Sequence, residues 1–97
     1  MTKPIHRNTD SRACGALTQV NGQKNVYANG LLVSVDKDPN SHSGGALSAR
    51  CKNVFVNGKM VVIVGNSAAP DSLCPPLGGA HCAPASSSGS GNVFVGS

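Results

Sequence analysis

The chain has 97 residues, a net charge of +4, 12 glycines, 6 prolines, 3% aromatic residues and no glutamate. This composition excludes a helical bundle, which would be rich in Ala, Leu, Glu and Lys, and it predicts a single all-β domain over residues 1–97. A chain this short, with so few large apolar side chains, also needs a covalent or metal staple to stay folded.

The positive charge is spread along the chain rather than gathered in one basic patch. A nucleic-acid interface usually clusters Lys and Arg and places aromatic residues between them, so a solvated basic surface is the favoured interpretation. A small zinc-stapled nucleic-acid-binding module stays open as the alternative. The basic residues are Lys3, Arg7, Arg12, Lys24, Lys37, Arg50, Lys52 and Lys59.

The N-terminus carries no apolar stretch typical of a signal peptide, and no segment approaches the ~20 apolar residues of a membrane span. We therefore expect a protein made in the cytoplasm without a signal peptide. In that reducing compartment, four cysteines are expected to bind a metal rather than to form disulfides.

Three copies of one short segment follow one another, at residues 25–30, 53–58 and 92–96. Each of the first two copies ends in an Asn-Gly pair, and an apolar run follows that pair. This pattern predicts hairpins with type I′ turns, because Asn and Gly tolerate positive φ. The third copy has no return strand after it, so its partner must come from a segment that the sequence does not identify. Approximate units are 14–41, 42–73 and 74–97, preceded by an N-terminal segment, 1–13.

Potential metal ligands stand in the same register in each unit. Cys14, His42 and His81 each lie eleven residues before the asparagine that opens a repeat. Three such positions converge on one axis if the units surround a pseudo-threefold, which is the simplest way for them to bury their apolar faces. The third unit has an extra stretch near residues 66–76, which carries Cys74.

Two thiolates and two imidazoles, from Cys14, His42, Cys74 and His81, suit one tetrahedral zinc ion and leave no position for a reacting water. The site is therefore predicted to be structural. Cys82 adjoins His81 and is an alternative ligand in place of His81 or Cys74.

The remaining candidate ligands, Cys51 and His6, have no counterpart in the other units. We expect Cys51 to be packed or idle and His6 to lie on the surface. An enzyme would need an open metal position and a nearby general base, and no motif places one of the four Asp beside the metal. We therefore expect no catalytic activity.

Several segments resemble the PAAR-repeat proteins, which cap the spikes of contractile injection machines. Residues 54–58 (VFVNG) are similar to the recurring strand and turn of that family, residues 38–45 (DPNSHSGG) to its first ligand loop, and Cys74-Pro75 with His81 to its later ligand pair. The quartet that names the family is absent after both Asn-Gly turns.

The resemblance implies a small conical pseudo-threefold domain of three β-hairpin repeats, with one structural zinc ion near the vertex. Its broad base would sit on the end of a trimeric β-helical spike, one tip per trimer, in a phage tail baseplate or a type VI secretion apparatus. Such a tip contacts the target membrane briefly during injection and binds no nucleic acid.

Overall fold

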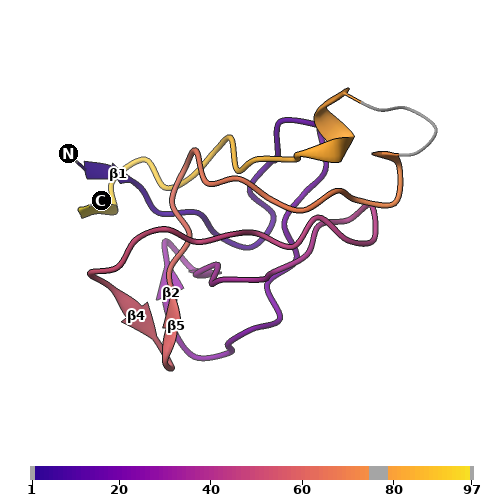
Figure 1. The fold of residues 1–97 in the computed structure, drawn as a ribbon. Helices are drawn as coiled ribbons and strands as arrows, with labels where there is room; N and C mark the ends of the chain where they lie inside the picture. Colours follow the sequence, from indigo (N-terminus) through magenta and orange to yellow (C-terminus); the bar gives the residue numbers. More distant parts are fainter. Residues whose placement is uncertain (1, 75–78, 97) are drawn as a thin grey trace.

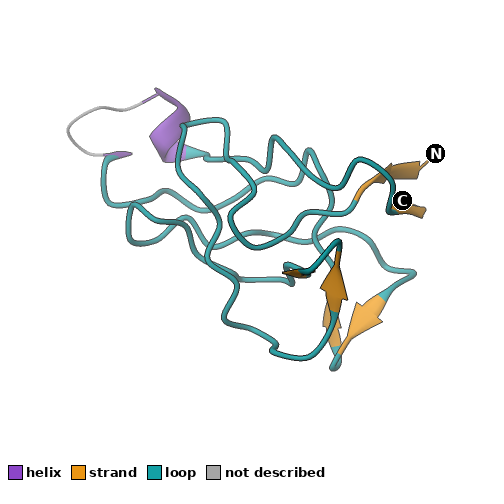
Figure 2. Ribbon diagram, turned by 180° about the vertical axis from the view of Figure 1, so that it is seen from behind, coloured by secondary structure: helices purple, strands orange, loops and turns teal. Residues whose placement is uncertain are grey.

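The structure is a computed structural model that describes residues 2–74 and 79–96, most of them in loops and turns around very short strands (Figures 1 and 2). Within these residues, no helix is long and apolar enough to cross a bilayer. The elements are β1 (Thr2–Pro4), β2 (Tyr27–Ala28), β3 (Leu31–Leu32), β4 (Phe55–Val56), β5 (Lys59–Met60), the 3-10 helix η1 (Gly79–Cys82) and β6 (Phe94–Gly96).

Both predicted hairpins are present. β2 pairs antiparallel with β3, and β4 with β5, each through a two-residue turn. The turn residues Asn29 and Gly30 have φ of 55° and 80°, and Asn57 and Gly58 have φ of 52° and 82°. Positive φ at both central positions is what a type I′ turn requires, so the Asn-Gly pairs set the register of these hairpins.

The third repeat completes its sheet with the start of the chain. β6 pairs antiparallel with β1, with Thr2 opposite Gly96 and Pro4 opposite Phe94. The return strand that the sequence left unassigned is therefore β1. The described ends of the chain lie side by side, and all three sheets lie toward one end of the molecule, with η1 toward the other (Figure 1).

β1, β3 and β5 each continue into what we call a return segment, over residues 4–8, 32–36 and 60–64, respectively. The three return segments are joined in closed rings of backbone hydrogen bonds. His6 donates its N–H to Val62, Val62 donates to Ser34, and Ser34 donates to His6, each at 2.9 Å. A second ring lies beside it, with N–H donors Asn8, Asp36 and Val64 and carbonyl acceptors Leu32, Met60 and Pro4, respectively, at 2.8–3.0 Å. Each segment thus binds both of the others, although the ladders between them are only single bridges.

The same turn ends each return segment. A buried Asp10, Asp38 or Asn66 accepts a hydrogen bond from the backbone N–H three residues earlier, at 2.8, 2.8 and 3.0 Å. The residue before each turn side chain has positive φ, 69° at Thr9, 76° at Lys37 and 96° at Gly65. Short polar side chains that bond their own backbone stabilise such turns, so Asp and Asn here have a structural role.

Small β-branched residues form the main core, with Val35 and Val61 fully buried between the return segments. Cys51 packs in this cluster with 1% of its surface exposed, in keeping with the expectation that it is packed. The prediction that His6 lies on the surface is wrong, since His6 is fully buried. His6 lies in the segment that follows β1, and no pattern in the sequence indicated that this segment would be buried.

Burial favours the neutral form of His6, and two polar groups satisfy its ring nitrogens. Its Nδ1 lies 2.7 Å from the Ser88 carbonyl, which can only accept, and its Nε2 lies 2.6 Å from the Thr18 hydroxyl. In the neutral ring Nδ1 carries the proton that goes to Ser88, so Nε2 accepts the proton of the Thr18 hydroxyl, to which Arg12 also donates. Burial, helped by the charges of Arg12 and Arg7, lowers the pKa of His6, against the opposing effects of the Ser88 carbonyl and of Asp10.

Because the folded pKa of His6 lies below the unfolded value of 6.5, its stabilising contribution should be complete above about pH 6.5 and should decrease as the pH falls below it. The slope from this group should approach at most about 1.4 kcal/mol per pH unit. Denaturant unfolding of the wild type and of His6→Gln from pH 5 to 8 would measure it. The other histidines are common to both proteins, so two parallel profiles would contradict the prediction.

Candidate metal centre

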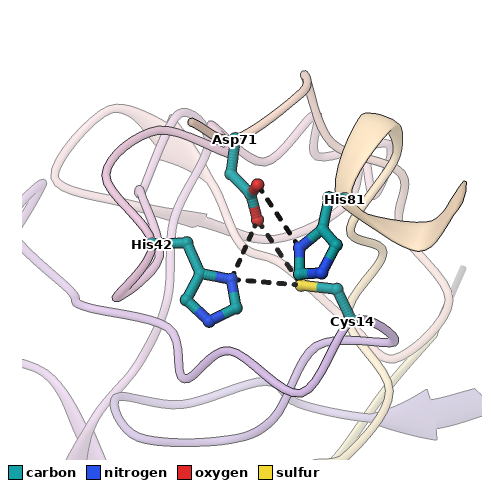
Figure 3. A group of neighbouring side chains, drawn as sticks. All are labelled: Cys14, His42, Asp71 and His81. Carbon is teal, nitrogen blue, oxygen red and sulfur yellow. Dashed lines mark hydrogen bonds and ion pairs between the residues drawn. The ribbon is translucent and has the colours of Figure 1, made fainter. Parts of the chain in front are cut away.

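Four potential ligands from separate loops converge at the end of the molecule opposite the strands. Cys14, His42, Asp71 and His81 each offer one ligand atom, and these atoms all lie within 4.8 Å of one another. Figure 3 shows the thiol, the carboxylate and the two imidazoles pointing toward a common centre. Among the described residues, this group can hold a metal ion.

The separations match those of a tetrahedral metal site. Cys14 Sγ lies 3.8 Å from His42 Nδ1 and 3.5 Å from Asp71 Oδ2. Asp71 Oδ2 lies 3.2 Å from His42 Nδ1, and Asp71 Oδ1 lies 3.5 Å from His81 Nδ1. Tetrahedral bonds of about 2.0–2.3 Å place neighbouring ligand atoms about 3.3–3.8 Å apart. These four separations are therefore near those of tetrahedral coordination, within a group whose ligand atoms lie up to 4.8 Å apart.

Asn40 holds two of these residues in place. Its side-chain oxygen accepts the backbone N–H of His42 at 2.8 Å, and its Nδ2 donates to Asp71 Oδ2 at 3.1 Å. Asn40 is itself buried, with 1% of its surface exposed. Such outer partners fix the orientation of ligands before a metal binds.

Asp71 is the central residue of the group, with a fully buried side chain. Burial by itself raises the pKa of a carboxyl, but hydrogen bonds from the Leu73 backbone, Asn40, Cys14 and His42 outweigh it and lower the pKa of Asp71 to about 2. The carboxylate is therefore charged at every physiological pH, as a metal ligand must be.

His81 contributes an unsatisfied nitrogen. It is carried by η1, and its backbone carbonyl accepts the N–H of Asp71 at 2.9 Å. Its Nδ1 is buried and makes no hydrogen bond with any described residue, although it lies 3.5 Å from Asp71 Oδ1. A buried polar atom without a partner is costly, and a metal ion in the centre would satisfy it.

The structure corrects the assignment of Cys74. It brings Cys14, His42 and His81 together as the repeat register indicated, but Cys74 forms a disulfide with Cys82, with 4.7 Å between their Cα atoms. Neither sulfur is then a thiolate, so neither Cys74 nor its alternative Cys82 is available as a ligand in this state. The expectation that these two cysteines would not pair is likewise wrong. The adjoining Pro75 lies outside the described residues.

Asp71 joins Cys14, His42 and His81 in this group, although the repeat register did not indicate it as a ligand. One signal was available, because Asp71 lies 29 residues after His42, close to the spacing of 28 between Cys14 and His42. The eleven-residue spacing before the asparagines points to His81 in the third unit and does not reach Asp71. Within the expected bounds 42–73, Asp71 belongs to the second unit, so the extra stretch near 66–76 lets that unit supply two ligands, His42 and Asp71.

Compared with known protein families and with curated proteins, the chain matches no family model and no individual sequence.

We predict that Asp71→Asn loses the metal whereas the double variant Cys74→Ser, Cys82→Ser retains it. The amide of Asn is a neutral and weaker ligand, so affinity should fall by more than the ~10–100-fold that the loss of an outer partner costs. The serines remove only sulfurs that already bind each other. Metal content of the purified proteins, followed by competition with a chromophoric chelator, would measure both.

The opposite pattern, with metal retained by Asp71→Asn and lost by the double variant, would restore Cys74 to the ligand set. As an independent control, alkylation of the unfolded protein without reductant should leave Cys74 and Cys82 unmodified. Modification of both under these conditions would contradict the disulfide.

Proposed function

We propose that this chain is a structural, non-enzymatic tip, folded around one zinc ion, that caps the trimeric β-helical spike of a contractile injection machine. The observation that carries the proposal is the closed ring of hydrogen bonds among three equivalent segments. Three equivalent units within one chain match the symmetry of a trimeric partner, so that one tip suffices per trimer.

The arrangement of the sheets supports a pseudo-threefold. Equivalent strands pair in the same register in all three sheets, with Tyr27, Phe55 and Phe94 opposite Leu32, Met60 and Pro4, respectively. Within each of the two rings, the return segments donate their hydrogen bonds in one direction, and the two rings run in opposite directions. A cone with its zinc near the vertex is the shape that we propose for this arrangement.

An exposed aromatic triad supports a docking surface at the strand end. Tyr27, Phe55 and Phe94 begin β2, β4 and β6 and expose 59%, 56% and 52% of their surface. They are the chain's only aromatic residues. Large apolar side chains left in water at equivalent positions are typical of protein interfaces, and aromatics are enriched there. We propose that this triad contacts the end of the spike.

Zinc fits the donor set best. One thiolate, two imidazoles and one carboxylate are all common zinc ligands, whereas calcium and magnesium prefer oxygen alone. Four protein ligands fill a tetrahedron and leave no position for a reacting water, which supports a structural role over catalysis. In this proposal the protein is made in the cytoplasm and assembles on the baseplate spike, and it meets the target membrane only during injection.

The alternative function, a nucleic-acid-binding module, is supported by the net charge alone, and two of the basic residues already have partners within the fold. Arg7 pairs with Asp10 at 2.9 Å, and Arg12 is buried with 2% of its surface exposed. Neither is free to contact phosphates, which leaves fewer basic groups for such an interface.

Mixing the protein with a purified spike trimer should give a complex of one tip to three spike chains by native mass spectrometry, and it should survive high salt because contact at the base is apolar. Replacing Tyr27, Phe55 and Phe94 together by Ser should abolish binding without loss of metal. The matched control is Leu17→Ser, which removes an apolar side chain that is 44% exposed on another loop. A stable 3:3 complex, or unimpaired binding by the triple variant, would refute the proposal.

Removing zinc with a chelator should destabilise the fold, because binding to the native state alone adds RT ln(1 + [Zn]/Kd), about 4 kcal/mol at a thousandfold excess over Kd. The metal-free protein should show a lower Tm and faster proteolysis, and it should bind the spike more weakly. An unchanged Tm would show that the metal does not support the fold.

A further inference from the structure

Arg12 is a large buried cation that the proposed function does not use. It heads the fully buried side chains of the described residues by volume, and no carboxylate among those residues lies within ion-pair distance of it. Burial lowers the pKa of Arg12 to about 10, so the guanidinium is still charged at neutral pH. A buried charge is expensive unless its donors are satisfied, so this one requires a structural reason.

Uncharged oxygens satisfy the guanidinium. Nε donates to Thr18 Oγ1 at 2.6 Å, and Nη1 donates to the carbonyls of Gly45 at 2.7 Å and Pro84 at 2.9 Å. Nη2 donates to the carbonyl of Asp38 at 3.1 Å. Four hydrogen bonds thus leave one side chain in four directions.

These acceptors lie in the loops that carry the metal group. Arg12 precedes Cys14 by two residues, Asp38 and Gly45 lie on either side of His42, and Pro84 follows His81 by three. Gly45 also attaches the loop of the fourth ligand, Asp71. It donates its N–H to the carbonyl of the neighbouring Pro70 at 3.2 Å. One guanidinium therefore joins the segments of His42 and His81 directly to that of Cys14, and it reaches the segment of Asp71 through Gly45.

The backbone at Gly45 is adapted to this contact. Gly45 has φ of +67°, and an added Cβ would lie 2.4 Å from Asn40 Nδ2 and 3.1 Å from Pro84 Cγ. No side chain fits there, and the space lets the 38–45 loop approach closely enough for its carbonyls to reach Arg12.

We infer that Arg12 is a positioning residue of the metal centre, which fixes the ligand loops relative to one another before the metal binds. This inference rests on the proposed metal site but not on the spike partner. The fork of a guanidinium is what the arrangement needs, since its donors point in fixed and divergent directions. A lysine ammonium keeps the charge but offers three donors from a single point, and it cannot reach carbonyls on several loops at once.

The test is a titration of the metal-free protein with Co²⁺, in which absorption reports affinity and ligand geometry together. Arg12→Lys should bind Co²⁺ about 10- to 100-fold more weakly than the wild type, as for other outer partners of metal ligands. Its spectrum should stay altered at saturation, because the ligands meet the metal at different angles. A purely structural role would lower stability yet return the wild-type spectrum once the site is full.

Arg7→Lys is the matched control. Arg7 is also a largely buried arginine, but it donates to Asp10 and Asn29 and contacts none of the ligand loops. It should keep wild-type Co²⁺ affinity and spectrum. If Arg12→Lys does not fold, Thr18→Val removes the acceptor of Nε at nearly the same volume, and it should weaken binding several-fold with a shifted spectrum.

Wild-type affinity and spectrum in whichever of these two variants folds would overturn the inference and leave the metal site standing. A wild-type protein that binds no Co²⁺ would overturn the metal site, and the inference with it. Neither outcome depends on the spike complex, so failure of the proposed cap would be recognised separately.

Discussion

The fold depends on the mutual hydrogen bonding of its three return segments. Each segment is too short to form a stable sheet with its own hairpin partner, since an isolated two-stranded hairpin is marginal in water. The ring through His6, Ser34 and Val62 joins every segment to the other two by backbone hydrogen bonds, and the small apolar side chains of these segments pack together in the core. Without the ring, three weak hairpins would have no common core.

The polar interior follows from this arrangement. Only small apolar residues fit between segments that approach so closely, and many backbone groups near the ring need partners that no regular sheet supplies. Asp10, Asp38 and Asn66 provide them at the turns, and Arg12 provides them under the metal group. In this protein, side-chain hydrogen bonds therefore satisfy backbone groups that the ladders between long strands satisfy in larger β domains.

The parts of the structure with a local sequence signal were predictable. Asn-Gly pairs require positive φ whatever surrounds them, so both hairpins could be located from the sequence. The register of Cys14, His42 and His81 could be counted because each lies the same eleven residues before its repeat. Pairing of β1 with β6 could not be predicted, because it joins residues 90 to 94 positions apart and Thr2–Pro4 has no repeat signature.

The errors at the metal centre have a related cause. Asp71 and Cys74 lie three residues apart in the inserted stretch, and the choice between them depends on how that stretch folds back. Cys74 is the expected ligand because two thiolates and two imidazoles suit tetrahedral zinc, but η1 brings Cys82 to Cys74 instead. His6 was misplaced because its segment looked like a polar terminus, although neighbouring segments bury it completely.

The pairing of the first and last strands makes the backbone nearly circular. Since Thr2 lies opposite Gly96, a short linker could join the two ends, and the chain could be reopened at the Asn57-Gly58 turn with every sheet still formed. In such a permuted chain, the third hairpin would become continuous and the second would be the split one. The order in which the segments follow one another along the chain is then separable from the architecture, as in rings assembled from identical subunits.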